Sequence, residues 1–237
     1  MIYLILFTIL FNADNVCAQQ KSVANIIMTR GKDVYVYSAG KKITVDGQPL
    51  PFSVYSGDEV QLGTDSDCEL VFANNDTMYA GAETLFSVDL YKGGMNYIWI
   101  KYGSLMYRGT LSVALKASDL FATSKGGDFL VRYKSTTSEA TILNFGADID
   151  VKQEDDDRPY VLRTNRYIKL VSFSAQNRLT GSINPEKIPF IYETFRIAFS
   201  PKEKELDTGA FNSSDRTGVM ASAKNANLDF VKRTIGL

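Results

Sequence analysis

The chain has 237 residues, of which 45% are hydrophobic and 22% charged, a composition that argues against disorder and fits one substantial domain or a domain with an appendage. Its 26 basic and 27 acidic residues nearly cancel, and no Lys or Arg cluster stands out, so we expect neither nucleic acid nor a polybasic membrane contact. The chain has 13 Tyr, 14 Phe and 6 Pro. This balance favours strands and predicts an all-β protein.

The first 18 residues have the pattern of a secretory signal peptide. The apolar run 2–11 is too short for a membrane span, which needs about 20 residues. Val16 and Ala18 supply the small-residue pattern of a cleavage site, although no Lys or Arg precedes the run. We expect export and removal of residues 1–18, which would leave no transmembrane anchor. A lipid attached to Cys17 is the alternative.

From about residue 32 the chain consists of short β-type runs separated by Gly, Asn and Asp, which is typical of a sandwich, barrel or rolled sheet. In chain order the runs are DVYVYSAGKKITV with a turn near Gly40, EVQL, CELVFANNDTMYA with a turn at 74–76, TLFSVDL, NYIWIKYG, SLMYRG, LSVAL, LFATS, DFLVRY, EATILNFG and ADIDVK. Alternation dominates over any helical period. We predict an antiparallel sandwich or a short rolled, solenoid-like sheet of many short strands.

The remaining residues divide into two further parts. The charged stretch QEDDDRP closes the main domain, residues 32–152, and residues 153–181 return to strand character in YVLRTNRYIKLVSFSA. We expect these additional strands to pack on or next to the main domain. Residues 182–237 form a less regular C-terminal extension, in which PEKIPFIYETFRIAF is a strand or a short helix. Its end has apolar residues at helical spacing, which predict a short helix that docks on a partner surface: Leu228, Val231 and Ile235.

The residue types present exclude several kinds of chemistry. Histidine is absent, so Ser-His-Asp and Cys-His catalysis and His-based zinc sites are excluded. Signal cleavage would remove Cys17 and leave Cys68 alone. Cys68 alternates in phase with Leu70 and Phe72, which predicts a small buried hydrophobe; a free reactive thiol is the alternative. We expect no enzymatic activity and no cofactor.

Acidic and aromatic residues suggest two kinds of ligand. Asp65, Asp67 and Glu69 alternate in TDSDCE, and 155–157 are three Asp, so calcium is a candidate because it binds several oxygens on a flexible loop. Neither stretch matches the EF-hand loop. We interpret Glu69 as lying on the solvent side of a strand and the three Asp as a solvated loop, and we expect no metal site. A row of aromatic residues could stack on sugars, although alternate rings inside and outside a β-protein give the same pattern: Tyr35, Tyr37, Tyr97, Trp99 and Tyr102.

The order of turns and strands resembles the FecR-like domain. GDEVQLGTDSDCELVFANNDTMYAGAETLFSV has a Gly-Asp entering a strand, a Gly-Thr turn with a following Ser, a strand, a polar turn and a strand; IWIKYGSLMY and LFATSKGGDFLVRYKSTTSEATILNFGADIDV resemble the second part of the family motif. The resemblance covers roughly residues 32–152. It implies an exported all-β interaction or envelope-binding module, common in Gram-negative bacteria, with no residue-level active site.

The same resemblance identifies structural positions and sets the functional expectation. The turn and core positions of the motif are Gly57, Asp58, Val60, Leu62, Gly63, Leu70 and Phe72. Family members that regulate sigma factors carry a helical segment and a membrane span ahead of the domain; we see neither here, and we do not transfer the anti-sigma activity.

We therefore expect an exported, non-enzymatic protein-protein interaction or scaffold module. We expect it in the periplasm, with outer-membrane association or secretion as alternatives. A binder of peptidoglycan or surface polysaccharide is the alternative function, and a carboxylate-based hydrolase is the least favoured. The partner would be an envelope protein or peptidoglycan, and the sequence does not predict the oligomeric state.

Overall fold

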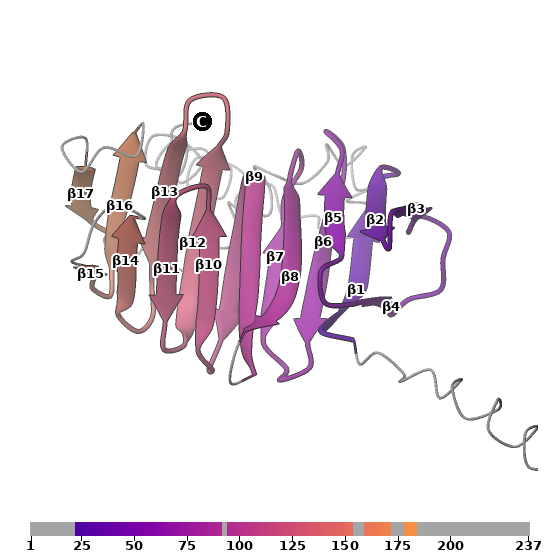
Figure 1. Cartoon of the computed structure of the whole chain (residues 1–237), viewed down its shortest axis with the longest axis horizontal. Helices are drawn as coiled ribbons and strands as arrows, with labels where there is room; N and C mark the ends of the chain where they lie inside the picture. Colours follow the sequence, from indigo (N-terminus) through magenta and orange to yellow (C-terminus); the bar gives the residue numbers. More distant parts are fainter. Residues whose placement is uncertain (1–21, 92–93, 154–158, 172–177, 184–237) are drawn as a thin grey trace, which may run out of the picture.

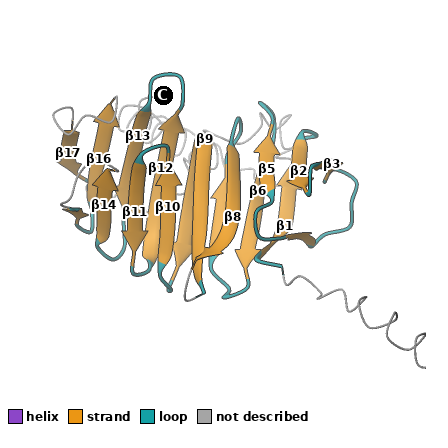
Figure 2. Cartoon of the chain, viewed as in Figure 1, coloured by secondary structure: helices purple, strands orange, loops and turns teal. Residues whose placement is uncertain are grey.

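The computed structural model describes residues 22–91, 94–153, 159–171 and 178–183 (Figures 1 and 2). Every regular element in these residues is a β-strand, numbered β1 to β17 in chain order, so the prediction of an all-β fold is confirmed. The predicted signal peptide, the three Asp at 155–157 and the C-terminal residues Leu228, Val231 and Ile235 lie outside the described residues.

The strands form two layers, which β9 joins. Sheet A contains, in spatial order, β4 (Phe52–Val54), β1 (Ala24–Arg30), β6 (Asp67–Phe72), β7 (Thr77–Ala80), the second half of β9 (Met95–Gly109), β12 (Gly127–Lys134), β13 (Glu139–Asn144), β16 (Arg166–Val171) and β17 (Arg178–Ser182). Sheet B contains β3 (Lys41–Thr44), β2 (Val34–Ser38), β5 (Glu59–Leu62), β8 (Leu85–Tyr91), the first half of β9, β10 (Val113–Ala117), β11 (Leu120–Ser124), β14 (Ile149–Gln153) and β15 (Tyr160–Leu162).

The chain passes repeatedly between the two layers. From β10 onward it places two successive strands in sheet B, the next two in sheet A, then two more in each sheet. Each hairpin therefore lies beside an earlier hairpin of the same layer, which gives the elongated two-layered shape of Figure 1. The strands between residues 153 and 181 continue these same two sheets.

Alternation along the strands fills the space between the layers. In EVQL, Val60 and Leu62 are buried in this core, and Cys68, Leu70 and Phe72 are the inward-facing residues of β6. Each fully buried aliphatic or aromatic side chain of this kind stabilises the fold by about 1.5–3 kcal/mol. The structure thus places the predicted apolar motif positions in the core.

Strand β9 differs from the two separate runs that the sequence predicts. It is a single strand of 15 residues that folds back at Gly103, so Asn96 Nδ2 in its first half lies 3.4 Å from Tyr107 Oη in its second half. Gly103 has φ +102°, and a Cβ there would meet Thr84 Oγ1 at 2.3 Å, so the fold-back requires glycine. The second half of β9 runs back toward the end at which the strand began, so β10, which reverses direction again, pairs with the first half of β9 in parallel. The other pairings of the described strands are antiparallel.

Three described strands were not predicted. Strand β1 precedes residue 32 and pairs with both β4 and β6, so sheet A begins before the predicted start of the domain. Its sequence, ANIIMTR, lacks clean alternation because the register shifts between Ile26 and Met28, which places Ile27 outside. Strand β4 is only three residues long, and β17, RLTGS, has no buried side chain, so neither stands out as a periodic apolar run.

Candidate functional site

The outer face of sheet B carries a row of aromatic and lysine side chains. Its cross-strand neighbours run from Tyr37 on β2 through β5 and β8 to Trp99 on β9, then to Lys116 on β10 and Phe121 on β11. The bulge at the β8–β9 register shift lets Lys101 and Tyr102 lie on this face as well. We call this surface the aromatic–lysine face: Tyr35, Tyr37, Lys42, Tyr97, Trp99, Lys101, Tyr102, Lys116 and Phe121.

The lysines of this face lie against its rings. The Nζ atoms of Lys101 and Lys116 are 4.9 and 5.5 Å from the centroid of Trp99, and Nζ of Lys42 is 3.5 Å from that of Tyr35. Trp99 nevertheless remains 38% exposed. A cation over an aromatic ring at an exposed site contributes about 0.5–1 kcal/mol, so these pairs orient long side chains without removing them from solvent.

Hydrogen bonds hold the tyrosines of the same face in place. Tyr37 Oη donates to Gln61 Oε1 at 2.7 Å, and Gln61 Nε2 donates to Tyr102 Oη at 3.4 Å. Tyr35 Oη donates to Asp33 Oδ1 at 2.8 Å, a bond that raises the pKa of Tyr35. The rings are therefore held by strand backbone and side-chain bonds while their outer edges stay accessible.

The sequence located the aromatic residues of this face but not its lysines. All five residues of the predicted aromatic row lie here, as the sugar-stacking interpretation requires. Lys42, Lys101, Lys116 and Phe121 join them only through strand pairing. One signal was present for Lys116, which lies between the buried Leu115 and Ala117 of its strand. The pairing register that unites the lysines could not be read from one sequence.

The glycines and Asp58 of the family-like motif have an architectural role. Asp58 Oδ2 accepts a hydrogen bond from the Tyr55 backbone N–H at 2.9 Å, and Asp58 N–H donates to Tyr55 O, which closes the turn that contains Gly57 and leads into β5. Gly63 lies against Asp33, where an added Cβ would come within 2.5 Å of the Asp33 Cβ. These residues fix the chain path and form no ligand site.

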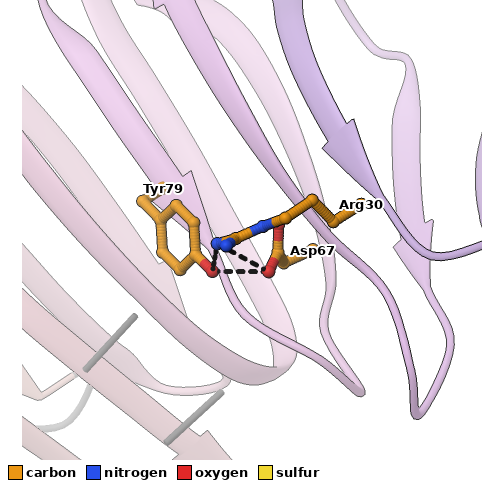
Figure 3. A network of polar contacts seen from close by, with 3 residues as sticks. All are labelled: Arg30, Asp67 and Tyr79. Carbon is orange, nitrogen blue, oxygen red and sulfur yellow. Dashed lines mark hydrogen bonds and ion pairs between the residues drawn. The ribbon is translucent and has the colours of Figure 1, made fainter. Parts of the chain in front are cut away.

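Asp67, one of the calcium candidates, belongs to a polar network on the outer face of sheet A (Figure 3). Its carboxylate accepts hydrogen bonds from Arg30 Nε at 3.1 Å and Tyr79 Oη at 2.7 Å, and Arg30 Nη2 lies 3.1 Å from Oδ2. Burial lowers the pKa of the Arg30 guanidinium, but the bonds and charge of Asp67 and Tyr79 outweigh it and raise the pKa overall. Asp67 is fully buried, so this network ties three strands together.

Asp76 forms a second network at the turn between β6 and β7. Its carboxylate accepts hydrogen bonds from Tyr107 Oη at 2.5 Å, Asn74 Nδ2 at 2.6 Å and the Thr110 backbone N–H at 2.9 Å. Burial, and then the bond to Asp76, raises the pKa of Tyr107 well above its usual range. The carboxylate joins this turn to the end of β9 through these three hydrogen bonds.

Among the described residues, the acidic candidates do not gather into a metal site. No group of three or more Cys, Asp or Glu side chains that could hold a metal occurs among them; Asp65 is exposed in a turn, whereas Asp67 is buried against Arg30. An open depression at one end of sheet A is lined by Asn74, Asn75, Asp76, Thr77, Arg108, Gly109, Thr110 and Asp128. Its central carboxylate, Asp76, is already bonded, and Arg108 pairs with Asp128 at 3.3 Å.

Comparisons with known proteins give a distant structural likeness. No protein-family model and no curated protein matches the chain. Two crystal structures of a "putative anti-sigma factor" from Parabacteroides distasonis ATCC 8503 are similar to it, with 10% and 9% identity and a TM-score of 0.48 in both cases. The match covers 56% of this chain and 63% of each of those chains. No helix in the described residues is long and apolar enough to cross a membrane.

Proposed function

We propose that the chain is an exported, non-enzymatic binding module whose aromatic–lysine face contacts a protein of the cell envelope. The observation that carries this proposal is the concentration of six aromatic and three lysine side chains on one sheet surface. Aromatic residues are enriched in protein interfaces, where a few of them supply most of the binding free energy. Trp99 lies in the middle of the row and is partly exposed, which makes it the expected anchor.

The position of the lysines favours a protein over a sugar as the partner. A sugar ring stacks on a bare aromatic face, but the ammonium groups of Lys101 and Lys116 already lie near Trp99. A protein partner can instead present carboxylates to the lysines and apolar groups to the ring edges. Protein interfaces commonly have such an aromatic centre surrounded by a polar rim. Lys101 also pairs with Glu59 on the same face, so both signs of charge are offered.

Affinity capture from envelope extracts of the source organism tests this proposal. The full chain, its Trp99→Ala variant and a Leu111→Ala control would be compared by quantitative mass spectrometry; Leu111 is an exposed apolar residue in the β9–β10 loop. We expect at least one protein to bind the wild-type chain and the control equally, and the Trp99 variant about 30-fold more weakly, as for a hot spot of about 2 kcal/mol. Equal recovery by all three chains contradicts the proposal.

The aromatic row also supports the alternative function, binding of peptidoglycan or surface polysaccharide. Sedimentation with purified sacculi separates the two functions. The proposal predicts that the chain stays in the supernatant, whereas pelleting that Trp99→Ala abolishes would favour the polysaccharide. Leu228, Val231 and Ile235 are an alternative docking element for a protein partner, and deletion of residues 207–237 tests them, since capture through the aromatic–lysine face should survive it.

A further inference from the structure

Four side chains of sheet A are buried although they point away from the core. Tyr79, Met106, Leu130 and Leu143 are successive cross-strand neighbours on β7, β9, β12 and β13, and they are 4%, 5%, 0% and 0% exposed. None of them belongs to the cluster that fills the space between the sheets. We call these four residues the covered row.

The described strands do not provide the cover. All of them belong to sheet A or sheet B, and sheet B packs against the opposite face of sheet A. The burial is also local: along the same cross-strand row, Glu69 on β6 and Tyr167 on β16 are only partly buried, and Leu179 of β17, on the same face, is 59% exposed. The cover is therefore deepest over a strip about four strands wide, and the side chains of the same row on either side of it are less buried.

We infer that residues 188–199 of the same chain, IPFIYETFRIAF, lie across the outer face of sheet A and bury the covered row. This stretch is the most apolar part of the sequence after Ser182. It follows β17, which is an edge strand of sheet A. Ile183, the last described residue before it, is buried and donates its N–H to Asn165 O at 2.8 Å, so the chain is still held at the sheet where the described part ends.

The length of the stretch fits this path. Five strand spacings of about 4.8 Å separate β17 from β7, which is about 24 Å, and twelve extended residues reach about 40 Å. A short tether also gives the segment a high effective concentration at the face. A second copy of the chain fits less well, because a packed sheet would also cover the exposed Leu179.

Charged groups beside the covered row are desolvated as this arrangement requires. Burial lowers the pKa of the Arg132 guanidinium and that of the Lys134 ammonium, both on β12. Arg132 lies opposite Ser104 and Thr141, which are also buried on this face. The segment thus closes one outer face of the module and leaves the aromatic–lysine face as the open one, an assignment that does not depend on what the open face binds.

Methionine oxidation in the full-length chain tests the inference. A Phe195→Asp/Ile197→Asp variant should loosen the segment, so that peroxide oxidises Met106 at least about tenfold faster than in the wild type, the change expected if the segment's contacts lose about 1.4 kcal/mol. Met78, in the core between the sheets, should stay protected and reports an intact fold. A matched Leu228→Asp/Val231→Asp variant should leave Met106 protected. Unchanged Met106 protection in the first variant, or equal exposure in both, overturns the inference.

Chemical cross-linking of the wild-type chain decides the matter if that variant unfolds. Lys187 and Lys202 flank the segment, so a short amine cross-linker should join them to Lys134 or Lys169 on sheet A and not to Lys116 or Lys152 on sheet B. The experiment uses a mixture of unlabelled and isotope-labelled chains. Links within one chain support the inference; links between differently labelled chains would show that a second copy covers the face, and links to sheet B would place the segment elsewhere. Either of these results overturns it.

Discussion

The outer faces of the two sheets are built from the same kind of strands and yet have opposite surfaces. On sheet B, β5 reads EVQL, and the side chains between its buried residues are polar. On sheet A, β12 buries three consecutive residues, Phe129, Leu130 and Val131. Strands that are apolar on both sides are typical of a sheet covered on both faces. The two outer faces therefore differ: side chains of sheet A are buried along β7, β9, β12 and β13, whereas the aromatic and lysine side chains of sheet B stay partly exposed.

Replacing one large apolar residue on each face should give the largest difference in stability between the two faces. Leu130→Ala should lower the free energy of unfolding by about 2–5 kcal/mol, as for a leucine in a packed core. Trp99→Ala should lower it by less than about 1 kcal/mol, because its ring is partly exposed and its lysine contacts are worth little. Urea denaturation measures both. Similar losses for the two variants would mean that the faces are equally covered.

The ion pairs of the two faces should differ in the same direction. Asp67→Asn removes the charge that the Arg30 guanidinium faces, and we expect a loss of about 2–3 kcal/mol, below the value for a fully buried pair because Arg30 is partly exposed. Glu59→Gln on sheet B removes the partner of Lys101, where both side chains are accessible, and should cost less than about 1 kcal/mol. Thermal denaturation of the two variants measures both losses of stability. A larger loss for Glu59→Gln than for Asp67→Asn would contradict the view that the ion pair on sheet A is the more buried one.

The fold-back of β9 connects the two faces, and one glycine controls it. Gly103→Ala should destabilise the protein by about 2 kcal/mol, because the residue has a positive φ and its Cβ would clash with Thr84. Gly40, in the β2–β3 turn, also has a positive φ but has open space around it, so Gly40→Ala is the control and should cost less. Denaturant midpoints measure the stability of the two variants. Equal losses would show that the positive φ alone, without the close approach to Thr84, accounts for the destabilisation by Gly103→Ala.

The free energy of unfolding should depend on alkaline pH through Cys68 in the core between the sheets, and substitutions on either outer face should leave this dependence unchanged. Burial raises the pKa of the Cys68 thiol well above its ordinary value of 9.0. The unfolded thiol ionises first, so stability is complete below about pH 9 and falls by about 1.4 kcal/mol for each pH unit above it. Cys68→Ala should lack this fall between pH 9 and about pH 10, above which the buried Tyr107 phenol adds a fall of its own, while Trp99→Ala should keep it. Urea midpoints between pH 8 and 10.5, read as differences from wild type, measure it; an identical alkaline slope in Cys68→Ala rules this explanation out.

Sequence reasoning predicted the fold better than the surfaces. Alternation in EVQL and CELVF was enough to place Val60 and Leu70 in the core, because one buried face imposes a period of two. The pairing of Asp67 with Arg30, 37 residues earlier, could not be predicted, because it depends on the register of β1 against β6. The consecutive apolar residues of DFLVRY and SLMYRG did carry a signal for a second covered face, but a continuous run does not say what covers it.

Tyr79 and Tyr97 provide the most direct test of the central claim, that the outer face of sheet A is covered and that of sheet B is open. Hydroxyl-radical footprinting of the full-length chain compares two side chains of identical reactivity, one on each face, so their rates differ through accessibility alone. We predict that Tyr97 is modified rapidly and that Tyr79, 4% exposed, is protected. Equal modification rates for the two tyrosines in the folded protein would contradict the claim.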